Sequence, residues 1–122
     1  MLILPTTLDK ITLTTDAATP VDVHASFLDA VATVVTGGRQ NTAIAAVTTT
    51  DIVSAPGAST SRNVHTIHIR NVHAANAVGV TINLVSAAAT AKPVSVTLAA
   101  GEKLAYVDGE GWRVFDVTGA ER

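Results

Sequence analysis

Residues Val94–Asp116 read VSVTLAAGEKLAYVDGEGWRVFD, and their pattern is the clearest indication of the fold class. Apolar and polar residues alternate in VSVTL, and this period of two places one face of a strand in a core. The alternation returns in KLAYV after the turn AAGE, and WRVFD follows the second turn, DGEG. We predict three short strands joined by glycine-containing turns, a β-meander that holds the only Trp and the only Tyr of the chain.

Working outward, the same alternation marks other strands. In Val21–Phe27 every second residue is apolar, which predicts one buried face. The following residues, Leu28–Val35, are compatible with a helical turn or with a continued strand, and Gly37-Gly38 are expected to end that segment in a hairpin turn. Further strands are expected at Lys10–Thr15, within Thr42–Val53, at Val64–Asn71 and at Val78–Leu84.

These segments predict an all-β chain. Short strands with turns at regular intervals are typical of an antiparallel β-sandwich, here Ig-like or jelly-roll-like with about eight short strands. Parallel βαβ winding would need helical patterns between the strands, and the sequence has none. We expect a single domain over residues 1–122, with an extended N-terminal arm at 1–8, an exposed loop at Pro56–Ser61 and a short C-terminal tail at 118–122.

Composition narrows the class of function. Of 122 residues, 15% are charged, 48% are hydrophobic and 3% are aromatic, and the net charge is −2. A nucleic-acid partner is not expected, because a basic footprint supplies most of that affinity. A membrane is not expected either, because no apolar run approaches the ~20 residues of a spanning helix. A Thr-rich surface with so few charges repels neighbours poorly, which favours a chain covered by other protein subunits.

The four histidines do not predict a metal site. His65 and His68 fall on opposite faces of one strand because their spacing is odd, and His65 is expected to share the inward face of Ile67 and Ile69. His24 can meet His68 on the outer face if their strands pair, but a zinc site needs three or four converging ligands.

Catalytic groups are not apparent. Asp108 and Glu110 belong to a glycine-flanked turn, where Asp is favoured because it bonds its own backbone. The chain has no Cys and no Gly-x-Ser-x-Gly elbow. We therefore predict neither an enzyme nor a cofactor. The residues best placed for an interaction are Tyr106, Asp108, Glu110 and Trp112, although Trp112 is favoured as a core residue over a platform for a sugar ring.

Three pieces of the sequence carry a resemblance, namely IHIRN at 67–71, LAAGE at 98–102 and DGEGWRVFD at 108–116. Together they resemble small β-sandwich virion structural proteins of tailed bacteriophages. The resemblance implies a structural role in the virion, after synthesis in the host cytoplasm, with capsid decoration as the leading role. It also implies a homo-oligomer, such as a trimer, and contacts with other virion proteins such as the major capsid protein. The alternative is a tail, neck or fibre component that binds a receptor or glycan.

Overall fold

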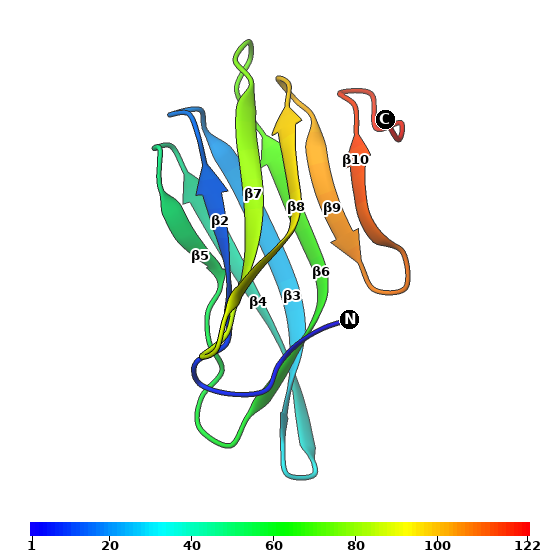
Figure 1. Ribbon diagram of the computed structural model, residues 1–122. Coiled ribbons are helices and arrows are strands. Elements are labelled where there is room, and N and C mark those ends of the chain that lie inside the picture. The colour runs from blue at the N-terminus through cyan, green and yellow to red at the C-terminus, as the bar shows by residue number, and fades with distance from the viewer.

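The computed structural model describes residues 1–122, which form ten strands and no helix (Figure 1). No helix that could cross a membrane is therefore present. The strands are β1 (Leu2–Leu4), β2 (Lys10–Thr15), β3 (Val21–Val31), β4 (Val34–Ile44), β5 (Thr49–Val53), β6 (Ser61–Asn71), β7 (Val78–Val85), β8 (Thr90–Leu98), β9 (Lys103–Val107) and β10 (Gly111–Phe115). The all-β prediction is confirmed, with ten strands where about eight were expected.

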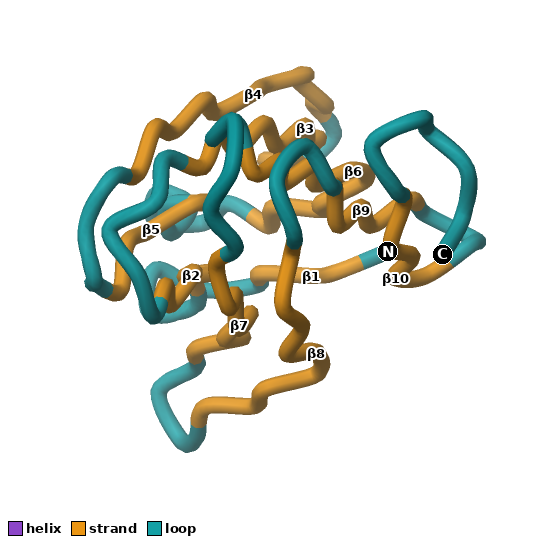
Figure 2. The backbone as a smooth tube through the Cα atoms, turned by 90° about the horizontal axis from the view of Figure 1, so that it is seen from above, coloured by secondary structure: helices purple, strands orange, loops and turns teal.

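Two antiparallel sheets form the sandwich (Figure 2). The first sheet has the order β10-β9-β6-β3-β4, and the second has the order β5-β2-β7-β8. Strand β1 joins the first sheet by pairing with β6, where Leu2 lies opposite Val64. Residues 1–8, where the sequence indicated an extended arm, thus contribute a strand, and Leu4 is buried.

The core lies between the inner faces of the two sheets. Strand β3 follows the predicted alternation, since Val21, Val23, Ala25 and Phe27 are all buried. They belong to one cluster of 19 buried apolar residues drawn from both sheets, which is the arrangement that a sandwich requires.

The predicted meander is wrong in one respect. Strand β8 pairs with β7 in the second sheet, whereas β9 and β10 form a hairpin in the first sheet. The turn at Ala99–Glu102 therefore carries the chain from one sheet to the other. The period of two identifies a strand with one buried face, but that face is equally well buried from either side of the core.

The prediction that Gly37-Gly38 form a hairpin turn is also wrong, because both residues lie inside β4. The turn is at Ala32-Thr33, between the paired residues Val31 and Val34, and Ala32 takes a positive φ of 52°. Gly38 lies opposite Phe27, and a Cβ at Gly38 would lie 2.5 Å from Cε2 of that ring. The glycine is needed for the space that the ring occupies.

A β-bulge corrects the expected orientation of His65. Ser26 pairs with Thr66 but Phe27 pairs with Val64, so His65 is the extra residue on β6. As a result Val64 is fully buried, whereas His65 is only half-buried.

A buried polar network closes one end of the sandwich. The side-chain amide of Asn71 donates to the carbonyl groups of Asn76 and Leu98, and its oxygen accepts the backbone N–H of His73. The carboxylate of Glu102 accepts the N–H of Ala99 at 2.7 Å and pairs with Arg122 at 2.6 Å.

We call this region, with the loops at 72–77, 99–102 and 116–122, the network end. The expected C-terminal tail at 118–122 is part of it, because Glu121 forms a β-bridge with Phe115. The three pieces of sequence that carry the phage resemblance reach this end through Asn71, through Glu102 and through the segment that follows β10. Asn71 and Glu102, which belong to these pieces, form the hydrogen bonds that hold the loops together.

Candidate interaction surfaces

Tyr106 and Trp112 lie opposite each other on β9 and β10, with ring centroids 5.2 Å apart and planes at 49°. Both rings face the core, and Tyr106 is only 6% exposed. Burial, and next the negative charge of Asp108, raise the pKa of the Tyr106 hydroxyl above its ordinary value. Trp112 is partly buried against the core. Tyr106 is therefore a core residue, and Trp112 covers the core at an edge strand.

Asp108 and Glu110 lie in the turn between β9 and β10, as the sequence predicted. The carboxylate of Asp108 is 2.7 Å from the amino group of Met1 and 3.5 Å from Nδ1 of His65. The hydrogen bond from the Met1 amino group is the largest of the effects that hold the pKa of Asp108 below its ordinary value. Glu110 is exposed, and its backbone N–H donates to the carbonyl of Val107. The four predicted residues are neighbours, but the two aromatic rings face inward and the two carboxylates do not.

The histidines are divided between separate places. His24 and His68 are cross-strand neighbours on the outer face of the first sheet, as expected if their strands pair. Nδ1 of His24 lies within hydrogen-bond distance of the amide oxygen of Asn41. His73 accepts backbone N–H groups from Ala75 and Asn76 and thereby shapes a loop. No group of three or more His, Cys, Asp or Glu side chains is arranged to hold a metal ion.

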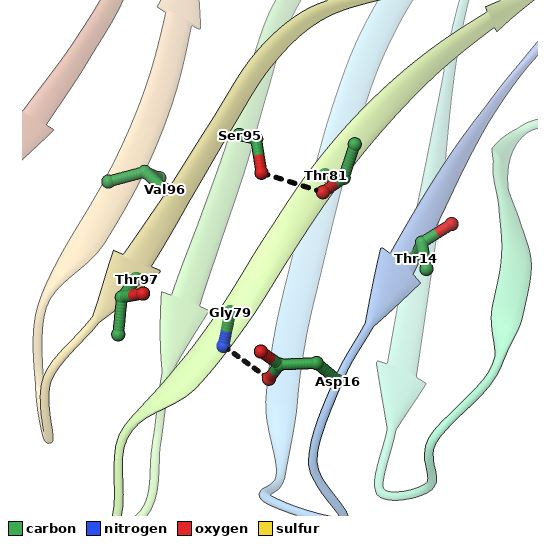
Figure 3. A pocket seen from close by; sticks show the side chains of 7 residues that line it. All are labelled: Thr14, Asp16, Gly79, Thr81, Ser95, Val96 and Thr97. Carbon is green, nitrogen blue, oxygen red and sulfur yellow. Dashed lines mark hydrogen bonds between the residues drawn. The ribbon is translucent and has the colours of Figure 1, made fainter.

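A shallow hollow of about 230 Å³ lies on the outer face of the second sheet (Figure 3). Its polar groups bond to one another: Thr81 pairs with Ser95 at 2.8 Å, and Asp16 accepts the N–H of Gly79 at 2.6 Å. Asp16 is the only ionisable residue among those that line it. This hollow has no second acidic or basic side chain to work with Asp16, so its geometry does not favour acid–base catalysis.

The tip of the β3–β4 hairpin carries a group of exposed apolar side chains. Val34 and Val35 are each 63% exposed, Val31 is 44% exposed and Leu28 is 39% exposed. Figure 1 shows the tip projecting beyond the rest of the sandwich, at the end opposite the network end. Scattered exposed apolar residues are ordinary, whereas a projecting group of four is a candidate contact surface.

A second apolar feature lies at this same end of the sandwich. A hollow of about 270 Å³ is lined by Leu2 and Ile3 of β1 and by Leu84, Val85 and Ala91 of the β7–β8 hairpin. Ile3 is 59% exposed, and the neighbouring Leu8 is 62% exposed. We call this region, with the tip of the β3–β4 hairpin, the hairpin end.

Sequence reasoning did not identify the hairpin end as a site. Its signal is the run LDAVATVV at 28–35, where apolar residues occupy both faces of the strands in place of alternating with polar ones. Strands that are apolar on both faces are usually buried on both faces, but here both faces of the hairpin tip are exposed.

Comparison of the chain with protein-family models, with curated proteins and with solved structures found no match.

Proposed function

We propose that this chain is a virion structural protein of a tailed bacteriophage, most specifically a capsid decoration protein that stabilises the head through subunit contacts. The observation that carries the structural role is the apolar hairpin end, a projecting surface that the chain itself does not cover. The phage assignment rests on the resemblance of 67–71, 98–102 and 108–116.

The energetic basis is burial of apolar surface between subunits. Complete burial of a Val or Leu side chain contributes about 1.5–3 kcal/mol relative to full exposure. The four side chains at the hairpin tip are already partly covered, so their further burial supplies on the order of a few kcal/mol for each subunit. A contact repeated over a shell stabilises the assembled state by mass action, because the decorating chain binds the shell and not its dissociated parts.

The surface composition is consistent with this role. Only 15% of residues are charged, and the outer face of the second sheet carries hydroxyl groups that bond to one another. When a surface with few charges associates with another protein, few charged groups must be removed from water. The desolvation of charged groups, which is a large unfavourable term in the free energy of association, is therefore small.

The test is light scattering on the purified chain, followed by mixing with heads assembled without it. We expect a defined oligomer that attaches to heads in a fixed copy number. A monomer that shows no affinity for heads would contradict the proposal. A glycan screen of the wild type then tests the alternative of a tail or fibre component, and specific sugar binding is the result that would favour it.

A further inference from the structure

A groove of about 430 Å³ crosses the outer face of the first sheet, and basic side chains line it. In one row, Arg70 of β6 lies beside Lys103 of β9. In the adjacent row, His24 of β3 lies directly opposite His68 of β6. Four basic side chains from three neighbouring strands therefore share one surface.

The cations of this groove lack carboxylate partners. Four of the eight Lys and Arg side chains form ion pairs with carboxylates, namely Lys10, Arg62, Arg113 and Arg122. Neither Arg70 nor Lys103 does, and the Lys103 ammonium lies instead 5.1 Å from the centroid of the Phe115 ring. Asp22 lines the groove opposite Arg70 in the register, but the two side chains form no ion pair. With neutral histidines, Arg70, Lys103 and Asp22 give the lining of the groove a net charge of +1, on a chain whose net charge is −2.

We propose that this groove binds an acidic segment of a partner protein through the carboxylates of that segment. Adjacent strands lie about 4.8 Å apart, and rows on one face are about 6.7 Å apart. Basic groups spread over two rows and three strands match several carboxylates on an extended chain better than one compact phosphate. The sheet backbone is paired here, so it adds no N–H cradle of the kind that binds single phosphate groups.

His68 makes this binding dependent on pH. Burial lowers the pKa of His68, and the charges of Lys103 and His24 lower it further. The other charged or titratable groups that line the groove with His68 are His24 and Asp22 of β3, Arg70 of its own strand and Lys103 of β9. Bound carboxylates favour the protonated imidazole, so binding takes up protons and strengthens as the pH falls. This inference does not depend on the proposed virion role.

The test is fluorescence anisotropy of a labelled octaglutamate peptide with the full chain, alongside a neutral Gly-Ser peptide. We expect the chain to bind octaglutamate and not the Gly-Ser peptide. Salt should weaken this binding, and lowering the pH from about 7.5 to about 5.5 should strengthen it. Lys103→Gln should weaken it about five-fold or more. The matched control is Lys92→Gln, which removes an unpaired charge from β8 in the other sheet and should change the affinity little.

Further measurements test the site of binding and the class of ligand. The imidazole proton resonances of His68 should titrate at a higher pH when octaglutamate is bound, which a non-specific charge effect elsewhere on the surface would not produce. Equal weakening by Lys92→Gln and Lys103→Gln would overturn the proposal. Tighter binding of a single-stranded oligonucleotide, or displacement of the peptide by inorganic phosphate at equal charge, would overturn it as well.

Discussion

The two ends of the sandwich differ most in one buried amide and one group of exposed valines. At the network end, the amide of Asn71 is fully buried and makes three hydrogen bonds. At the hairpin end, Val34 and Val35 are exposed to solvent although nothing in the backbone requires apolar residues there. A buried polar side chain with all its partners is explained by folding. Exposed apolar side chains on a projecting hairpin are not, and the contact with other subunits that we propose would account for them.

A single strand, β6, connects the two ends of the sandwich. Strand β6 runs from Ser61, which pairs with Ala30 near the hairpin tip, to Asn71 in the polar network. Substitutions at its two ends should therefore have different consequences. Changes at the network end should lower the free energy of unfolding, whereas changes at the hairpin tip should lower association and leave folding intact.

The largest effect on stability is expected for Asn71→Ala. The change leaves the carbonyl groups of Asn76 and Leu98 and the N–H of His73 without their side-chain partner. We expect a loss of about 2–4 kcal/mol in the free energy of unfolding, measured by urea denaturation. The control is Asn76→Ala, because that side chain is exposed, and it should cost less than about 0.5 kcal/mol. Equal stability of the two variants would contradict the importance of the network.

An intermediate effect is expected within β4, where two adjacent glycines provide a matched pair. Gly38→Ala forces a Cβ to 2.5 Å from the Phe27 ring, whose guanidinium neighbour Arg62 lies 4.0 Å from the ring centroid. We expect this overpacking to cost about 1–3 kcal/mol. Gly37→Ala places its Cβ 3.8 Å from Leu28, an ordinary contact, and should be nearly neutral. The argument for Gly38 would be wrong if both variants melted at the same temperature as the wild type.

The smallest expected effect is the loss of a stabilising contribution from Asp116, at the network end, when the pH is lowered. The carboxylate of Asp116 accepts the hydroxyl and the N–H of Thr118 and the N–H of Ala120. The bond from the Thr118 hydroxyl is the largest effect that lowers the pKa of Asp116 below 3.8. Because the folded-state pKa is depressed, this contribution is present above about pH 3.8 and is lost as the pH falls through the lower folded value.

Asp116→Asn should therefore remove part of the acid sensitivity of the C-terminal segment. Amide hydrogen exchange of residues 117–122, followed as the pH is lowered with correction for intrinsic rates, measures this directly. Identical protection profiles for the variant and the wild type throughout the acid range would contradict the assignment.

The fold was predictable where local pattern determines structure. The alternation in Lys10–Thr15 and Val21–Phe27 places the strands and their buried faces correctly, because burial of one face requires a period of two. The hairpin turn was misplaced because Ala32, which takes the positive φ, carries no glycine signal. Gly38 leaves room for the ring of Phe27 on the paired strand. That contact can be predicted only when the register of the two strands is known.

The site was less predictable, for a related reason. The sequence favoured Trp112 as a core residue, and its ring does pack against the core, but Tyr106, offered as an interaction residue, is buried beside it. The basic groove joins His24 to residues of two later strands, and their meeting depends on strand order. The hairpin tip was visible only as an ambiguous apolar run, since the sequence does not show that other strands leave it uncovered.

A direct test of the hairpin end as a contact surface compares Val34→Asp with Val47→Asp in attachment to heads assembled without the protein. Val34 is 63% exposed at the hairpin tip, and Val47 is 67% exposed beyond the other end of β4. Both variants should fold with stabilities within about 0.5 kcal/mol of the wild type. We expect Val34→Asp to lose attachment and Val47→Asp to retain it. Full attachment of Val34→Asp would contradict the claim that the hairpin end is the contact surface.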